Sequence, residues 1–203
     1  LGLGNYRNCK IPTKLQFYKK IISIHASFSY TIFVTTEGVS FCGQLGLNKL
    51  LCENRPMRLD FDNEIVCDII NVCLGTEFII FHTTRGIYVL GSNKSGQLGL
   101  GDFDDRRSLS KLQFKHPIIS INCSCEYTMI NTVDGIYAFG SNRYGQLCLG
   151  DTKSRNTPTK IPFDLEATSI HCGEYHVMIN TRDGVFACGK NHHGELGLGD
   201  INN

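Results

Sequence analysis

Short apolar runs rich in β-branched and aromatic residues follow one another along the chain, separated by glycine, asparagine and aspartate. Residues 118–123, 127–132 and 136–140 show the pattern clearly, and runs of this length and composition are typical of β-strands. Asp134-Gly135 and Asp183-Gly184 each separate two such runs, and glycine there accepts the positive φ of a tight hairpin turn. The pattern predicts antiparallel strands joined by hairpins, and it contains no helical period long enough for a substantial helix.

A further apolar segment in each part of the chain predicts an outer strand. Three of the four segments contain proline, which cannot donate a hydrogen bond within a sheet and is therefore confined to edge strands. A basic residue recurs within each segment, where it can discourage edge-to-edge pairing; the alternative is a basic rim that binds an acidic partner. The segments are 12–17, 56–61, 109–114 and 158–163, and their basic residues are Lys14, Arg58, Lys111 and Lys160.

A phrase of the form Gln-Leu-Gly-Leu-Gly-Asp recurs five times, and its opening leucines are 44 to 53 residues apart. A period of this size is the signature of repeat architectures, and four antiparallel strands per period describe one blade of a β-propeller. The sequence therefore predicts an all-β protein in which residues 1–203 form a single propeller. Its repeat units are 1–44, 45–97, 98–146 and 147–195, and residues 196–203 begin a further unit.

Charge and hydropathy narrow the range of partners. The formal net charge of +1 provides no large field of one sign, so it does not support a nucleosome or DNA contact. No apolar stretch approaches the ~20 residues of a membrane-spanning helix, and the first residues lack the pattern of a signal peptide. We expect an intracellular protein, cytoplasmic or nuclear, without a membrane partner.

Four of the ten cysteines occupy positions that are apolar in other repeats, which predicts core packing. Cys42 and Cys188 match Leu90 and Phe139, and Cys123 and Cys172 match Ala26 and Leu74. Cys123-Ser-Cys125 is the only close pair, and it lacks the further ligands of a zinc site. His192 and His193 are adjacent, so in extended chain they point in opposite directions. We therefore expect neither a metal site nor a structural disulfide.

The glycine-rich loops share the outer glycine spacing of a phosphate-binding loop, but glutamine stands where the lysine is required and no helix follows. Turn chemistry accounts for the same residues, because glycine permits tight turning between blades and Asn and Asp bond local backbone groups. We expect no bound cofactor and no catalytic residue. The structural motif comprises Gly91, Asn93, Gly96, Gln97, Gly99, Gly101, Gly140, Asn142, Gly145, Gln146, Gly150, Gly189, Asn191, Gly194, Gly197 and Gly199.

The fourth unit contains Ile170-His-Cys-Gly-Glu-Tyr-His176, then Asp183-Gly184, and then a Gly-Glu-Leu-Gly-Leu-Gly-Asp phrase. This succession resembles the repeat of the regulator of chromosome condensation family, and the resemblance covers essentially the whole chain. The family implies a seven-bladed propeller, of which about four blades would be present here. It also implies an interaction platform: the founding member is an exchange factor for the Ran GTPase that docks on nucleosomes.

The resemblance implies Glu174 and His176 as partner-binding residues, because acidic and histidine side chains from such turns meet the GTPase in the founding member. Only the fourth unit keeps both glycine and histidine at the Gly-x-x-His positions; the others place Tyr30, Phe78 or Tyr127 at the histidine position. A structural alternative is that His176 bonds a backbone group inside the blade.

We therefore expect a protein-interaction module without covalent chemistry. The alternatives are a guanine-nucleotide exchange factor for a Ran-like GTPase and a purely structural repeat region of a multidomain protein. The chain starts and ends on the same phrase and has no initiating methionine, which indicates a piece of a longer protein. Closure of four blades and assembly of two chains are the other arrangements of the ring.

Overall fold

The computed structural model describes residues 2–17, 19–45, 52–59 and 68–199. Within these residues the chain is all-β, and it contains no helix. Residues 46–48 of the second repeated phrase and residues 60 and 61 of the predicted segment 56–61 lie outside the described residues.

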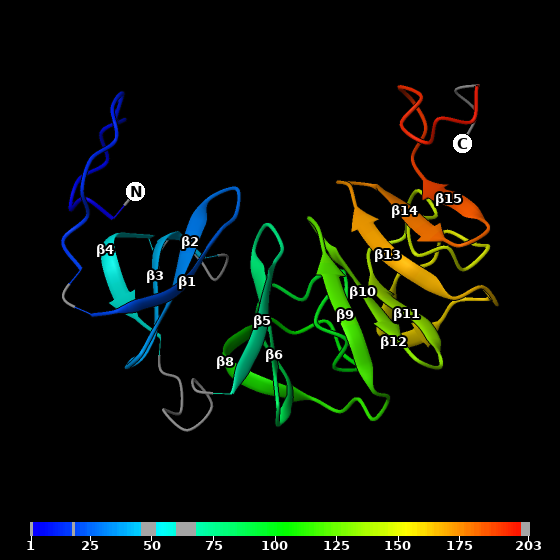
Figure 1. Ribbon diagram of the computed structural model, residues 1–203, viewed down its shortest axis with the longest axis horizontal. Coiled ribbons are helices and arrows are strands. Elements are labelled where there is room, and N and C mark those ends of the chain that lie inside the picture. Colours follow the sequence, from blue (N-terminus) through cyan, green and yellow to red (C-terminus); the bar gives the residue numbers. More distant parts are fainter. Residues whose placement is uncertain (1, 18, 46–51, 60–67, 200–203) are drawn as a thin grey trace.

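The strands form four antiparallel sheets that follow one another in chain order (Figure 1). The first sheet contains β1 (Ile21–Ala26), β2 (Tyr30–Thr35), β3 (Gly38–Gln44) and β4 (Cys52–Arg58). The second contains β5 (Ile69–Leu74), β6 (Phe78–Thr83), β7 (Gly86–Gly91) and β8 (Arg106–Leu112). The third contains β9 (Ile118–Cys123), β10 (Tyr127–Thr132), β11 (Gly135–Gly140) and β12 (Arg155–Lys160). The fourth contains β13 (Ala167–Cys172), β14 (His176–Thr181) and β15 (Gly184–Gly189) among the described residues.

Each sheet is one blade of a β-propeller, which confirms the predicted fold class. The predicted strands 118–123 and 127–132 coincide with β9 and β10. The outer strands begin several residues before the predicted segments, and residues 12–17 form no strand. The repeated phrase also lies elsewhere than predicted: it connects the third and fourth strands of one blade, as 97–102 does between β7 and β8, rather than two blades.

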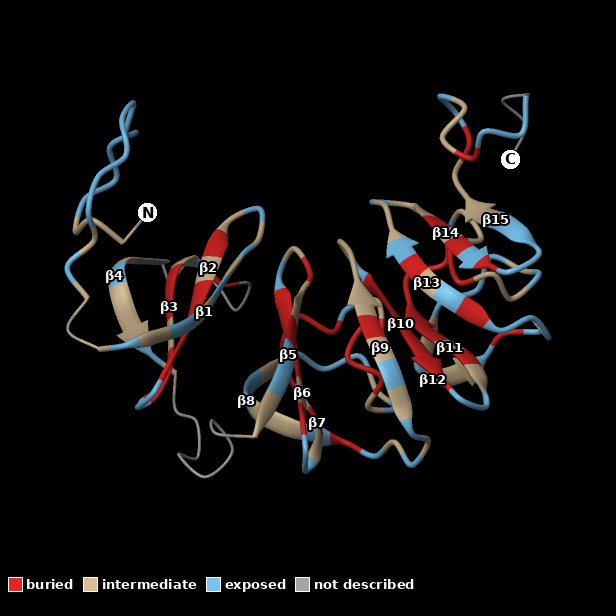
Figure 2. Cartoon of the chain, in the orientation of Figure 1, coloured by how far each residue is buried: buried red, intermediate tan, exposed pale blue. Residues whose placement is uncertain are grey.

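The core of the molecule lies between adjacent blades. Side chains alternate in direction along a strand, so Tyr127 and Met129 of β10 pack against the fourth blade, whereas Ile130 packs against the second. Every residue of β10 is buried for this reason, and Figure 2 shows the same concentration of burial along the middle of the first three blades. Each blade therefore needs a neighbour on both faces.

Apolar side chains are exposed on the two outermost blade faces, which have no described neighbour. Ile24 of β1 is 56% exposed, whereas Ile121, its equivalent in the third blade, is 3% exposed. Val185 of β15 is 63% exposed, whereas its equivalent Ile136 is 1% exposed. The first and fourth blades lie at opposite ends of an open arc (Figure 1), so the four blades do not close a ring by themselves.

Tyrosine hydroxyl groups link two of the three blade interfaces. The Tyr127 hydroxyl donates to the carbonyl oxygens of Gly173 and His176 at 2.7 Å each. Tyr30 makes the equivalent bonds to Gly75 at 2.9 Å and to Phe78 at 2.6 Å. Burial raises the pKa of both phenols, so the hydroxyl groups stay protonated and able to donate.

One cysteine prediction is wrong. Cys148 and Cys188 form a disulfide with their Cα atoms 5.7 Å apart, which joins the phrase after β11 to strand β15 of the next blade. Spacing in the sequence did not indicate this pair because 40 residues separate its members, and the fold brings them together. Cys42, by contrast, is buried as predicted.

We predict that Tyr127→Phe lowers the free energy of unfolding by about 1–2 kcal/mol, because the ring still fills its site while two buried carbonyls lose their donor. Urea denaturation followed by circular dichroism measures the change. Tyr88→Phe is the control, because the Tyr88 ring lies under Lys111 at the half-buried face of β7. Equal stability of Tyr127→Phe and the parent protein would contradict a stabilising role for these hydrogen bonds.

Candidate protein-interaction surface

Buried amide side chains shape the loop that follows the third strand in the second, third and fourth blades. The Asn142 side chain is fully buried; its Oδ1 accepts from the backbone N of Leu147 at 2.9 Å, and its Nδ2 donates to the Asp151 carbonyl at 2.9 Å. Asn93 makes the equivalent bonds in the second blade, and Asn191 accepts from the N of Leu196 in the fourth. The predicted structural motif is thus a repeated hydrogen-bonded frame.

The glutamine of the phrase fixes the tip of the same loop in the second and third blades. Gln146 Oε1 accepts from the backbone N of Tyr144 at 3.0 Å, as Gln97 Oε1 does from that of Ser95. In the fourth blade Glu195 replaces glutamine, and its carboxylate accepts from the N of His193 at 2.7 Å. The backbone at the tip of the loop, at Tyr144, Ser95 or His193, is therefore held in place.

Ion pairs join the end of the loop to the outer strand. Asp151 pairs with Arg155 at 2.7 Å, and Asp102 pairs with Arg106 in the same way one blade earlier. The hydrogen bond from the guanidinium group is the main cause of a lowered pKa for both carboxyl groups. Both aspartates are therefore ionised at neutral pH.

We define the loop face as the surface formed by these loops (92–105, 141–154 and 190–199) and by the turns between the first and second strands of the blades (27–29, 75–77, 124–126 and 173–175). Adjacent blades touch here. Ser95 Oγ donates to Glu126 Oε2 at 3.2 Å across the second and third blades. At the equivalent place between the third and fourth blades, the rings of Tyr144 and Tyr175 lie 5.1 Å apart.

The contact between Tyr144 and Tyr175 is the centre of an aromatic cluster that also contains Lys190 and His192. The Lys190 Nζ lies 5.6 Å from the Tyr175 ring centre and 5.9 Å from that of Tyr144. The His192 ring meets Tyr144 edge-on at 6.0 Å. Tyr144, Tyr175 and Lys190 are half-buried and His192 is exposed, so the cluster combines rigid packing with access to a partner.

Carboxylates also lie on the loop face, on the turns of three successive blades. Glu77, Glu126 and Glu174 are all exposed, and the described part of the chain shows no ion pair for any of them. A hydrogen bond with Glu174, followed by partial burial, raises the pKa of Tyr175 to about 12. The Tyr175 hydroxyl is therefore protonated at neutral pH and donates toward the Glu174 carboxylate.

The structure separates the environments of the two predicted partner-binding residues. Glu174 is exposed on the loop face beside Tyr175, whereas His176 is half-buried at the start of β14. The imidazole packs directly on Gly173, where an added Cβ would overlap the ring, and the His176 carbonyl accepts from Tyr127. Glycine at position 173 is explained by this contact. No hydrogen bond from the imidazole to a backbone group is among the contacts of the described residues.

Sequence reasoning missed Tyr144, Tyr175 and Lys190. In other units the equivalent positions hold Ser95, Glu126 and Ser141. No repeated pattern therefore singled out these three residues. The signal that could have found them is their departure from the repeat: the framed loop tip and the adjacent turn of the next blade both carry tyrosine only at this interface.

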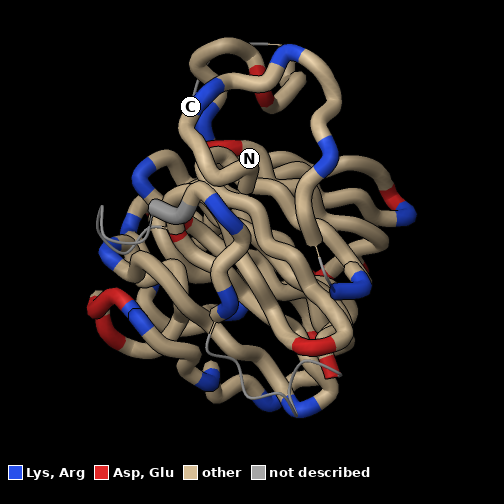
Figure 3. Tube along the Cα trace, turned by 90° about the vertical axis from the view of Figure 1, so that its left-hand side faces the viewer, with Lys and Arg blue, Asp and Glu red and all other residues tan. Residues whose placement is uncertain are grey.

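The basic residues of the outer strands lie at the opposite end of the blades. Lys111 and Lys160 lie beside Gly86 and Gly135 of the hairpin turns, and Arg58 lies beside Gly38. Lys111 also covers the Tyr88 ring at 5.7 Å. Figure 3 shows basic and acidic residues dispersed over the surface rather than gathered by sign.

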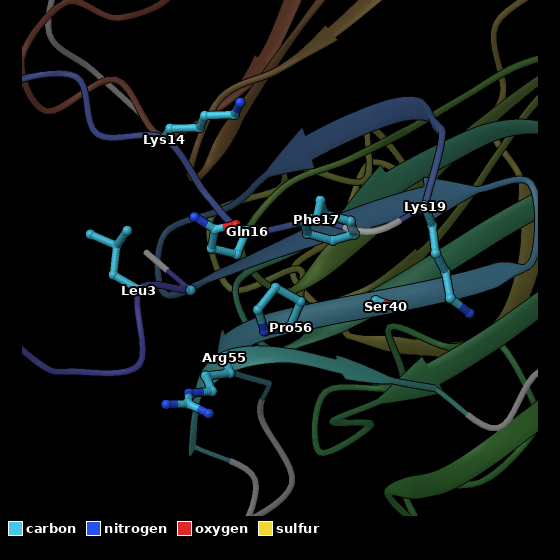
Figure 4. Close-up of a pocket in the computed structure, with 9 residues that line it drawn as sticks. Leu3, Lys14, Gln16, Phe17, Lys19, Ser40, Arg55 and Pro56 are labelled. Carbon is cyan, nitrogen blue, oxygen red and sulfur yellow. The ribbon is translucent and has the colours of Figure 1, made fainter.

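A cavity of about 610 Å³ lies between the N-terminal segment and the first blade. Lys14, Lys19 and Arg55 line it together with Leu3, Gln16, Phe17, Ser40 and Pro56 (Figure 4). The charged ends of the three basic side chains point away from one another in Figure 4, and Lys19 pairs with Glu37 at 2.8 Å. The cavity therefore lacks the convergent polar groups of a ligand site.

The described residues contain no group of three or more His, Cys, Asp or Glu side chains placed to hold a metal ion. No helix in that part of the chain is long and apolar enough to cross a membrane.

The arrangement of sheets defines a β-propeller with a framed loop face, and comparisons with solved structures give the same fold. Human WBSCR16 superposes with a TM-score of 0.75 and 20% identity, over 94% of this chain and 52% of that chain. Yeast RCC1 (Prp20), solved bound to Kap60, gives 0.75 and 19%, over 92% and 45%. Prp20p of Saccharomyces cerevisiae in a second structure gives 0.70 and 20%, over 90% and 46%. The chain spans about half the length of these structures.

The family model of the regulator of chromosome condensation (RCC1) repeat matches residues 86–130 and 134–179. The fold is therefore that of a β-propeller, and these two stretches of the chain match the repeat of this family. No curated protein sequence matches the chain.

We predict that Asn142→Ala lowers the free energy of unfolding by about 2–4 kcal/mol, because it leaves the buried Leu147 amide and the loop carbonyls without partners. Urea denaturation measures the loss, and amide exchange at Leu147 should accelerate. Asn122→Ala is the control: it also removes an Asn side chain in the third blade, but Asn122 is half-buried and bonds only Ser120 Oγ among the described contacts. Equal losses in the two variants would contradict the framing role of Asn142.

Proposed function

We propose that the chain is a protein-interaction module and that its loop face binds a protein partner. The aromatic cluster of Tyr144, Tyr175, Lys190 and His192 is the observation that carries this proposal. Tyrosine dominates binding energy in protein interfaces, because it buries a large apolar area and has few rotatable bonds to order. Here the loop frame already holds the two rings in place, which reduces the entropy lost on binding.

The carboxylates of the loop face favour a partner with a basic surface. Glu77, Glu126 and Glu174 present three carboxylates from consecutive blades, and positive groups on a partner would complement them. The net charge of +1 gives no comparable support for DNA. We infer that the partner is a protein, and that the chain acts inside the cell, in the cytoplasm or nucleus.

Guanine-nucleotide exchange on a Ran-like GTPase is the second candidate, and two observations favour it. Prp20p, one of the similar structures, was described together with its binding properties to Gsp1p and histones. Glu174 lies on the loop face, at a position that the family resemblance assigns to GTPase contact. Exchange needs no covalent step: a face that binds the nucleotide-free GTPase more tightly than the loaded form shifts the equilibrium toward release. Under this proposal Glu174 and His176 contribute to that face.

We predict that Tyr144→Ala and Tyr175→Ala each weaken binding of a nucleotide-free Ran-type GTPase or of core histones by about tenfold, as expected for interface anchors. Titration calorimetry with each purified probe measures the affinity. Asp183→Ala is the control, because Asp183 is an exposed acid of the same blade in the turn at the other end of β14. An equal loss with Asp183→Ala would contradict the loop face as the binding site. Absence of binding by both probes would favour the purely structural alternative.

We predict for the exchange candidate that the full-length protein accelerates release of a fluorescent guanine nucleotide from a Ran-type GTPase, and that the acceleration saturates with concentration. Glu174→Ala and His176→Ala should reduce it while circular dichroism shows an intact fold. No acceleration by a folded protein would exclude exchange on this GTPase and leave the interaction module. Full activity in both variants would remove these residues from the exchange surface.

A further inference from the structure

The Cys148–Cys188 pair joins a loop-face segment to the neighbouring blade. Cys148 lies in the loop that also carries Tyr144, and Cys188 lies in β15 two residues before Lys190. The Cα separation of 5.7 Å falls within the range that a disulfide spans without movement of the backbone. The bond therefore connects the two elements that present the aromatic cluster.

The preceding interface shows how the same two positions pack when neither is cysteine. Gly99 of the second blade lies against the ring of Phe139 in the third, and a Cβ at Gly99 would come within 2.9 Å of that ring. One blade later the glycine is Cys148 and the phenylalanine is Cys188. A side chain has been added on one side of the contact and a ring removed on the other. Both changes concern the same contact, so they form a matched pair.

The backbone at Cys148 supports this pairing independently. Its φ is +56°, and among the described residues it is the only non-glycine with a positive φ. Gly99 and Gly197 hold the equivalent positions with φ of +72° and +66°. The left-handed conformation costs a residue with a Cβ about 1 kcal/mol relative to glycine. Core filling does not account for that cost at a half-buried loop position, whereas a bond to Cys188 does.

The other cysteines near the centre of the blades differ chemically. Burial raises the pKa of Cys172 to about 12, and that of Cys123 also lies well above its ordinary value. Their thiols stay protonated and unreactive, since thiolate is the form that exchanges with disulfides. Cys148 and Cys188 differ from them because they lie within bonding reach of each other, and among the described residues they form the disulfide.

We propose that Cys148 and Cys188 form a reversible redox site that fastens loop 141–151 to the fourth blade. The oxidant is a low-molecular-weight disulfide. One protein thiolate attacks it and releases one small thiol, which leaves a mixed disulfide; the second protein thiolate attacks the bonded protein sulfur and releases the other small thiol. The two protein thiols lose two electrons and two protons, and the small disulfide gains them as two thiols. A small thiol in excess reverses both steps.

Oxidation then holds Tyr144 against Tyr175, and reduction frees the loop to move relative to β15. Any consequence for partner binding rests on the proposed function, whereas the fastening of the loop does not. The loop is held at its base by Asn142 in both states, so reduction loosens the loop without unfolding the blade.

The test uses the full chain equilibrated with oxidised or reduced glutathione. Alkylation and peptide mass spectrometry identify the bonded cysteines, and amide hydrogen exchange follows residues 141–151. We expect a Cys148–Cys188 bond in the oxidised sample and exchange in the loop that is about tenfold faster after reduction. Cys148→Gly with Cys188→Phe is the matched control, because it restores the Gly99 and Phe139 combination of the preceding interface. Its loop should be ordered and indifferent to glutathione.

The outcomes separate this proposal from the proposed function. Bonding of a different cysteine pair while Cys148 and Cys188 remain open to alkylation overturns the redox site. Equal exchange of the loop in the two redox states, or the same redox response in the double variant, overturns the fastening. A redox response of the loop in a protein whose probe binding is unaffected by Tyr144→Ala supports the fastening and contradicts the binding role of the cluster.

Discussion

The burial of both faces of every blade by its neighbours is the constraint on which the rest of the structure depends. A single short sheet of this kind cannot cover its own apolar residues, and β10, buried along its whole length, shows that two neighbours are required. The tyrosine hydrogen bonds across the interfaces also run in one direction along the chain, from one blade to the following one. Tyr30 and Tyr127 each donate to two carbonyls of the following blade and receive nothing equivalent in return. Apolar packing holds the blades together, and these polar bonds fix how one blade is placed on the next.

Contacts at and beside the same interfaces hold the loop face in place. In the second and third blades the loop is framed from within by a buried asparagine and is joined by an ion pair to the outer strand, so its backbone does not depend on the residue at its tip. That independence explains why the tip position can carry serine in one blade and tyrosine in another. Function can then vary at the tips while the frame repeats, which is the usual division between a scaffold and the sites built on it.

The sequence was enough to predict the all-β fold, the blade repeat and the positions of β9 and β10, because these follow from periodicity and turn chemistry that act locally. It predicted the frame residues, such as Asn142, as turn formers, but it did not reveal that they bond across the loop. The placement of the phrase within a blade was not predictable, since the repeat reads the same wherever the boundary is drawn. The Tyr144 and Tyr175 contact and the Cys148 and Cys188 bond join different units, and only the packing of one blade on the next brings them together.

The contact between the repeated phrase and the third strand of the next blade links the packing of the blades to the loop face. It is Gly99 with Phe139 at one interface and Cys148 with Cys188 at the next. It is part of the interface that the fold requires, yet it lies directly below the loop tip that a partner would meet. At Gly99 this contact does not respond to redox conditions, because neither glycine nor phenylalanine has a redox-active group. A pair of cysteines at the same place makes the contact depend on the surrounding redox potential. Under the proposed redox site, the exchange of two residues in one structural contact makes the position of the loop depend on redox conditions, with no change to the fold around it.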